Sequence, residues 1–189
     1  MYLDLTINVS QKSPLIQWAK SQENPYIAMG HIGTHLDTYE KSNIPIDYFK
    51  SIGVIFDVRN IDEVSCKDIN LNDVPENSFV IFRTGHIEKY SYGEKEYFDN
   101  HPQLSHNLIS MLCQKKIRFI GIDCAGIRQH QDHEKADRFC EKHGVYVIEN
   151  LCNLDKIVKN NFLIYTMWLN EEELTGLKCR VIVDSNYSL

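Results

Sequence analysis

Short runs of β-branched and aromatic residues recur along the chain and predict extended segments. They fall at residues 2–8, 53–58, 79–83, 117–123, 145–149, 162–168 and 179–184. Runs of this length and composition are typical of β-strands. Helical periodicity is clear in residues 105–115, where Leu108, Ile109 and Leu112 mark one face, and in residues 132–143, which Gly144 ends. Many strands with few helices predict α/β or α+β layering rather than a doubly wound fold.

Length and composition indicate an ordinary globular protein. The chain has 189 residues, of which 43% are hydrophobic and 24% charged. These values exclude collagen-like, low-complexity and disordered classes. Because no repeat, linker or biased segment is visible, residues 1–189 are predicted to form a single domain.

Charge and hydropathy exclude several kinds of partner. The net charge of -6 argues against a nucleic acid or an anionic membrane surface as partner. The longest apolar stretch, at 162–169, is far shorter than the roughly 20 residues that cross a bilayer. The first residues lack the features of a secretory signal, so a cytoplasmic location is expected. Six scattered cysteines without a Cys-x-x-Cys pair are expected to be reduced and mostly in the core.

The segment richest in candidate chemistry is His31-Ile32-Gly33-Thr34-His35-Leu36-Asp37. Imidazole nitrogens and carboxylate oxygens bind divalent metals such as zinc or manganese. On an extended chain His35 and Asp37 point to the same face, and Gly33 permits the turn that brings His31 to them. A helical arrangement is disfavoured by Gly33. The spacing alone also arises by chance in chains with this many histidines, so it does not decide the matter.

Several further segments, taken together with this one, resemble a known family. The chain is similar to the cyclase family of metal-dependent hydrolases, which includes bacterial kynurenine formamidase and isatin hydrolase. The resemblance rests on His-x-Gly-Thr-His-x-Asp at 31–37, Phe-Arg-Thr-Gly at 82–85, His-Pro-Gln-Leu-Ser at 101–105, Gly-Ile-Asp at 121–123 and the Gly-to-Leu segment at 144–151. It covers about residues 1–155 and implies a swivelling β/β/α-type α/β domain with a mixed sheet and few helices.

The resemblance also implies roles for individual residues. His31, His35 and Asp37 would bind a first zinc or manganese ion, Asp37 would be able to bridge to a second, and Glu149 would be a further ligand. Trp18 falls where the family has a tryptophan against the substrate. The purely structural alternatives are an exposed glutamate after a core strand for Glu149 and a half-buried aromatic anchor for Trp18. Relatives of this kind are usually oligomers, so a homodimer or homotetramer is expected.

Two positions depart from the formamidase pattern. Lys41 stands where formamidases carry a histidine assigned to proton transfer, and Tyr39 replaces a proline in the same segment. A lysine can transfer protons near neutral pH only if its pKa is lowered by burial or a nearby positive charge. Asp137 stands where formamidases carry a histidine ligand, with His133 one helical turn earlier. On a helix these two residues share a face and either could reach the metal, although a solvated helix surface is the alternative.

The predicted activity is hydrolysis of a small amide, lactam or ester. A bound divalent metal supplies a reactive water and polarises a carbonyl group. The leaving group needs an acid, for which Lys41, His133 and Asp137 are candidates, and His86 after the Thr84-Gly85 turn is a further candidate for contact with the substrate. For His86 the alternative is a loop histidine at a strand end.

Two other interpretations remain open at this point. A cysteine hydrolase is suggested by Cys124, which follows a predicted strand, although Gly121 stands one position too early for a nucleophile elbow. A buried structural cysteine is the common case. A binding protein that keeps the fold but has lost activity is suggested by Lys41, because a fold does not determine a function.

Overall fold

The computed structural model describes residues 1–40 and 43–186. The strands are β1 (Tyr2–Asp4), β2 (His35–Asp37), β3 (Lys50–Asp57), β4 (Glu63–Val64), β5 (Ser78–Arg83), β6 (Gln103–Leu104), β7 (Phe119–Ile122), β8 (Tyr146–Glu149), β9 (Phe162–Trp168) and β10 (Gly176–Asp184). The α-helices are α1 (Pro14–Lys20), α2 (Pro25–Gly30), α3 (His86–Lys89), α4 (Lys95–Phe98), α5 (His106–Gln114) and α6 (His133–Lys142). Short 3-10 turns lie at Ile46–Phe49, Leu71–Asp73, His130–Asp132 and Leu154–Lys156.

The main sheet closes on itself as a mixed barrel. Its order is β1-β10-β2-β8-β7-β5-β3-β9, and β9 pairs with β10 as well as with β3. Strands β3, β5, β7 and β8 run parallel to one another. Strands β2 and β9 flank this group in the antiparallel direction, and β10 pairs antiparallel with both of them. The predicted α/β class with a mixed sheet is confirmed, and each of the seven predicted extended segments overlaps a strand.

Alternation along the strands separates two cores. On β5, Phe79 and Ile81 face the barrel interior, while Val80 and Phe82 face the helices. The same period of two gives β7 and β8, like β5, one side for each core. Each set of apolar side chains is removed from water, which is the main stabilising term for the fold.

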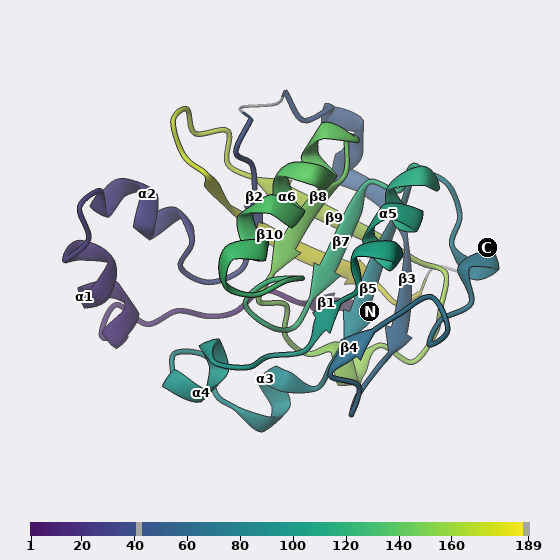
Figure 1. Ribbon diagram of the computed structural model, residues 1–189, viewed down its shortest axis with the longest axis horizontal. Coiled ribbons are helices and arrows are strands. Elements are labelled where there is room, and N and C mark those ends of the chain that lie inside the picture. Colours follow the sequence, from purple (N-terminus) through teal and green to yellow (C-terminus); the bar gives the residue numbers. More distant parts are fainter. Residues whose placement is uncertain (41–42, 187–189) are drawn as a thin grey trace.

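Helices α5 and α6 cover the outer side of the barrel, where they lie across β5, β7 and β8 (Figure 1). The side-chain oxygen of Ser105 caps α5 by accepting a hydrogen bond from the Leu108 amide at 3.2 Å. Helix α6 ends before Gly144, whose φ of +71° is in the left-handed region. Both helices match the predicted segments to within one residue at each end.

A small lobe of α1 and α2 stands beside the barrel, at the left of Figure 1. The sequence analysis did not predict either helix. Each begins at a proline that follows a capping residue, Ser13 for α1 and Asn24 for α2. The lobe is attached where α2 packs on β10, because Gly30 leaves room for the backbone of Gly176. This contact places the residue that follows α2, His31, beside the sheet.

Two further observations bear on the sequence expectations. All six cysteines are unpaired, and Cys113, Cys124, Cys140 and Cys179 are buried. No helix in the described ranges combines the length and the apolar character needed to span a bilayer.

Candidate metal centre

The motif at residues 31–37 folds so that its three polar side chains meet. Strand β2 directs Leu36 into the barrel core and leaves His35 and Asp37 on the outer side, under α6. Gly33, with a φ of +85°, turns the chain between α2 and β2. As a result His31 Nδ1 lies 3.1 Å from His35 Nε2 and 3.3 Å from Asp37 Oδ1, and His35 Nε2 lies 3.4 Å from Asp37 Oδ1. The predicted geometry of the motif is confirmed.

A second group of ligand-type side chains adjoins the first. His133 and Asp137, one turn apart on α6, have Nε2 and Oδ2 3.4 Å from each other. Glu149 at the end of β8 lies 3.4 Å from His133 through Oε1 and 3.6 Å from His35 through Oε2. Glu149 reaches His35 because the two residues are direct partners across the β2–β8 ladder. Asp37 belongs to both groups, since its carboxylate lies within 4.8 Å of the ligand atoms of the second.

The acidic side chains of this cluster are buried, which distinguishes the cluster from a solvated helix surface. Asp137 is 2% exposed and Glu149 is 3% exposed, so neither is the exposed acid that the alternative interpretation described. Both Asp37 oxygens, both Asp137 oxygens and Glu149 Oε1 accept no hydrogen bond from any described residue. Buried ionised oxygens without donors are costly unless a cation is present.

The pKa shifts of the clustered carboxyl groups also indicate a site that suits a cation. Burial, together with the nearby charge of Asp37, raises the pKa of Asp137 and of Glu149 well above their usual values. Burial would raise the pKa of Asp37 too, but the neighbouring His35 and His31 rings hold it well below its ordinary value. Without a cation, therefore, some of these carboxylates take up protons and lose their negative charge.

In the neutral form that binds a metal, the two histidines of the motif would each present a nitrogen lone pair to the cluster. His35 Nδ1 donates to the Gly33 carbonyl at 2.9 Å, which leaves Nε2 unprotonated on the neutral ring. His31 Nε2 lies 2.8 Å from Thr175 Oγ1, and its Nδ1 faces Asp37. Two ligands on one ion with bonds of about 2.1 Å are themselves about 3.0–3.4 Å apart. The separations of 3.1 to 3.6 Å fit a divalent metal.

The cluster lies at the floor of a cavity of about 810 Å³. Trp18 from α1 lines this cavity and is 51% exposed, and its contact with a substrate stays a prediction. The wall also carries aromatic and imidazole groups, namely Tyr39, Tyr92, Phe98, His101 and His130, together with the charged side chains of Lys95 and Glu134. A small molecule with a flat ring fits walls of this kind.

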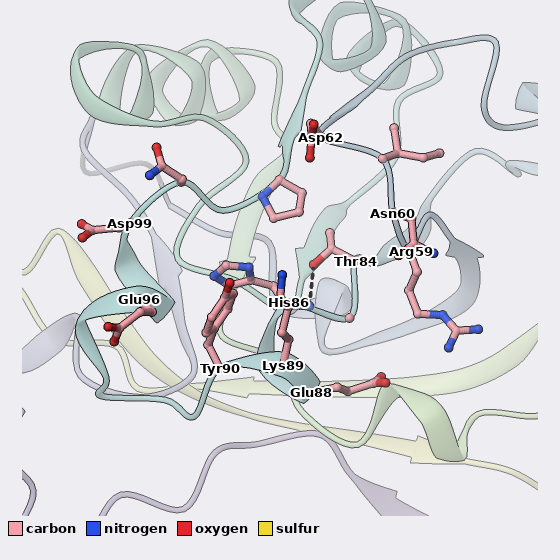
Figure 2. A pocket seen from close by; sticks show the side chains of 14 residues that line it. Arg59, Asn60, Asp62, Thr84, His86, Glu88, Lys89, Tyr90, Glu96 and Asp99 are labelled. Carbon is pink, nitrogen blue, oxygen red and sulfur yellow. Dashed lines mark hydrogen bonds between the residues drawn. The ribbon is translucent and has the colours of Figure 1, made fainter.

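His86 lies in a different cavity, of about 550 Å³, on the side of the Thr84-Gly85 turn (Figure 2). Its Nε2 donates to the Tyr97 carbonyl at 2.8 Å, and His86 does not line the cavity that contains the metal cluster. A contact between His86 and a substrate at the cluster is therefore not supported. In Figure 2 the charged side chains of Arg59 and Asp99 point in opposite directions, so they do not converge on a common ligand.

Lys41 lies outside the described residues, but the segment before it is firmly held by Glu141 of α6. The Glu141 carboxylate accepts hydrogen bonds from the Thr38 hydroxyl at 2.7 Å, the Tyr39 amide at 2.6 Å and the Glu40 amide at 2.9 Å. The sequence analysis did not single out Glu141, because no local pattern relates it to residues more than 95 positions away. It couples the position of the chain after Asp37 to the helix that carries Asp137.

Cys124 does not have the surroundings of a nucleophile. It is completely buried, and its thiol donates to the carbonyls of Gly126 and Pro102. Burial raises the pKa of this thiol well above its usual value. Because the thiolate is the reactive form, the cysteine-hydrolase interpretation loses its support.

Other residues that the sequence analysis missed hold the motif loop. Asn150 Nδ2 donates to the Gly33 carbonyl at 3.1 Å, and the Asn150 carbonyl accepts from the Thr34 hydroxyl at 2.7 Å. The Tyr97 hydroxyl donates to Asn150 Oδ1 at 2.8 Å. The Tyr92 hydroxyl accepts from the Gly33 amide at 2.6 Å. Only Asn150 carried a sequence signal, since it directly follows Glu149.

Comparison with known proteins gives a consistent result. Residues 3–129 match the model of the family described as "Putative cyclase". The kynurenine formamidase of Bacillus cereus is 25% identical over 184 residues, which cover 89% of this chain and 85% of that protein. The kynurenine formamidase of Bacillus mycoides is 24% identical over 163 residues, covering 81% and 75%.

Solved structures show the same fold. A potential metal-dependent hydrolase with cyclase activity superposes with a TM-score of 0.74 at 22% identity, over 97% of this chain and 96% of the other. Isatin hydrolase A from Labrenzia aggregata superposes with a TM-score of 0.76 at 18% identity, over 97% and 93%.

Proposed function

The chain belongs to the cyclase family, and from this premise we propose that it is a metal-dependent hydrolase of a small amide, lactam or ester. One observation carries the proposal. Three buried carboxylates with oxygens that accept no hydrogen bond from the described residues and three imidazoles meet within a few ångströms at a cavity lined in part by aromatic side chains. The names of the relatives, kynurenine formamidase and isatin hydrolase, support a small carbonyl compound as substrate.

We assign the ligands to two ions that share Asp37. His31, His35 and Asp37 would hold the first, and Asp37, His133, Asp137 and Glu149 the second. Three buried carboxylates carry up to three negative charges, which one divalent ion would leave partly uncompensated. The charge balance therefore favours two ions. In this assignment His133 and Asp137 serve as metal ligands rather than as acids.

The donor atoms favour zinc or manganese. The first group has two imidazoles, which suit zinc, whereas carboxylates predominate in the second, which suits manganese equally well. Magnesium and calcium prefer oxygen ligands alone and are disfavoured by His31 and His35.

The side chains around the cluster would orient the substrate, exclude water and supply a proton. A bound divalent ion lowers the pKa of a water molecule and polarises a carbonyl oxygen. Trp18, Tyr39 and Phe98 would orient the ring of the substrate and exclude bulk water from the floor of the cavity. Lys41, which follows the segment held by Glu141, stays the candidate for protonation of the leaving group.

A binding protein on the same fold is the second candidate. The observation that favours it is Lys41 itself, a residue with an ordinary pKa of about 10.4, at the position where formamidases carry histidine. Such a protein would bind the metal and a small aromatic compound but would not turn it over. Measured hydrolysis decides between the two.

Elemental analysis and an activity panel test the proposal. Purified protein should contain stoichiometric zinc or manganese, and it should hydrolyse at least one of formanilide, isatin and 4-nitrophenyl acetate. A chelator should abolish this activity, and the added metal should restore it. His35→Ala should remove the metal while leaving the circular dichroism spectrum unchanged. Full metal content in His35→Ala would show that the ligands are wrongly assigned.

We also interpret residues 1–189 as a single domain, because β1 and β10 from opposite ends of the chain pair in one sheet. Light scattering after size-exclusion chromatography tests the expected homodimer or homotetramer.

A further inference from the structure

Tyr92 presents a hydroxyl group next to the metal cluster. It lies in the loop between α3 and α4, and its hydroxyl oxygen is 2.6 Å from the amide nitrogen of Gly33. Gly33 lies in the motif loop between His31 and His35, and its carbonyl orients the His35 ring. The hydroxyl is therefore tied to the backbone that shapes the first ligand group.

The proton of this hydroxyl has no acceptor in the described part of the chain. A phenol oxygen can accept one hydrogen bond and donate another. Tyr92 accepts from the Gly33 amide, and the structure gives it no donation to any described residue. Tyr97, the neighbouring buried tyrosine, differs in this respect because its hydroxyl donates to Asn150 Oδ1.

The ring is held in place and lines the cavity that contains His31, His35 and Glu149. It packs edge-on against Tyr97 and Phe98, with ring centroids 5.3 and 5.9 Å away. Burial raises the pKa of Tyr92 to about 12, so the hydroxyl keeps its proton at neutral pH. A fixed, protonated donor in a partly desolvated site is well suited to stabilise a developing negative charge.

Resting on the proposed hydrolase function, we propose that Tyr92 is a catalytic residue that donates a hydrogen bond to the carbonyl oxygen of the substrate. When the oxygen of water bonds to the carbonyl carbon, the π electron pair moves to that carbonyl oxygen. The C–N or C–O bond then breaks, and the leaving atom receives a proton that came from the water. Tyr92 keeps its own proton throughout and lowers the free energy of the charged transition state.

Tyr92→Phe tests this role, with Tyr48→Phe as the matched control. Tyr48 is also half-buried and its hydroxyl also makes one hydrogen bond, to the Gly144 carbonyl at 3.2 Å, but it does not line the cavity. With a substrate that the wild type hydrolyses, kcat of Tyr92→Phe should fall on the order of 10²-fold at saturating metal. The metal content should not change. Tyr48→Phe should keep kcat within about twofold of the wild type.

A structural role for Tyr92 gives a different result. If the hydroxyl only steadied the Gly33 loop, Tyr92→Phe would bind metal more weakly, and excess metal would restore its kcat. Restored activity, or a kcat within about twofold of the wild type, overturns the inference while leaving the hydrolase proposal intact. Metal-loaded wild type that hydrolyses nothing refutes the hydrolase proposal.

Binding of phenylphosphonate, a tetrahedral anion, gives a readout that does not need turnover. Isothermal titration calorimetry should show at least tenfold weaker binding to metal-loaded Tyr92→Phe than to the wild type and to Tyr48→Phe. Equal affinity for all three proteins would refute hydrogen-bond donation by Tyr92, whatever their activity.

Discussion

Replacement of Asp137 by asparagine should change stability in opposite directions with and without metal. Asparagine keeps the size of the side chain but removes a charge that lies within 4.8 Å of the ligand atoms of Asp37 and Glu149. At that separation, two unit charges repel by about 3.5 kcal/mol for an effective dielectric constant of 20. Part of this repulsion is relieved in the metal-free protein, because the raised pKa values of Asp137 and Glu149 favour proton uptake.

For metal-free Asp137→Asn we therefore expect a free energy of unfolding about 1–2 kcal/mol above that of the wild type. With metal bound, the wild type becomes more stable than Asp137→Asn. A metal at 100 times its dissociation constant stabilises the wild type by about 2.7 kcal/mol, and a variant that binds 100-fold more weakly gains only about 0.4 kcal/mol. Loss of a carboxylate ligand is expected to weaken binding by at least this factor.

Urea unfolding at pH 7.5, first in chelator and then in zinc or manganese, measures both differences. Glu76→Gln is the control, since it removes a charge at an exposed position that is paired with Lys116 and lies outside the cluster and its cavity. It should change stability by less than about 0.5 kcal/mol under both conditions. A metal-free Asp137→Asn protein less stable than the wild type would refute the repulsion argument, and undiminished metal affinity would refute the assignment of Asp137 as a ligand.

Three further predictions concern groups around the cluster. Glu141→Gln should lower the free energy of unfolding by about 2 kcal/mol in chemical denaturation. The reason is that the carboxylate that accepts three hydrogen bonds from the segment before Lys41 loses its charge. An unchanged denaturation midpoint would contradict this. Asp123, whose pKa burial raises to about 6, should contribute stability that is complete below about pH 4 and declines by up to about 3 kcal/mol as the pH rises to about 6. Asp123→Asn should therefore show a flatter dependence of unfolding free energy on pH over that range, and an identical slope would argue against the raised pKa. Lys41→Met should lower kcat without loss of metal if Lys41 protonates the leaving group, whereas unchanged turnover would exclude it from that role.

The parts of the site that the sequence predicted depend on short, regular spacings. His35 and Asp37 share a face because a strand repeats every two residues, and His133 and Asp137 share one because a helix returns after four. The pairing of His35 with Glu149 was beyond such reasoning, because it depends on the register between two strands more than 100 residues apart. The resemblance to the cyclase family supplied Glu149, whereas the geometry of the residues alone did not.

Local spacing in the sequence does not predict features that depend on side-chain direction or on tertiary packing. His86 follows the Thr84-Gly85 turn closely and lines a cavity separate from that of the metal cluster, so its contact with a substrate stays a prediction. Helices α1 and α2 have 7 and 6 residues, which is too few for a clear apolar period. Their capping signals, Ser13 before Pro14 and Asn24 before Pro25, were present in the sequence. Such signals have more weight than periodicity for helices of two turns or less.

The departure at Asp137 shows how the site keeps its donor set. The resemblance implies a histidine at this position, and here the imidazole comes from His133, one turn earlier, which lies at the same distance from Glu149 as from Asp137. Room for this ring depends on Gly126, where a Cβ would lie 2.5 Å from His133 Nδ1 and where φ is +121°. In the proposed assignment the imidazole would be retained while Asp137 adds a carboxylate, so the second group would have more negative charge than a set with histidine in its place. We expect a more negative donor set to make the ion a weaker Lewis acid, which would favour substrates whose carbonyl groups are already activated, such as aryl formamides, strained lactams and aryl esters.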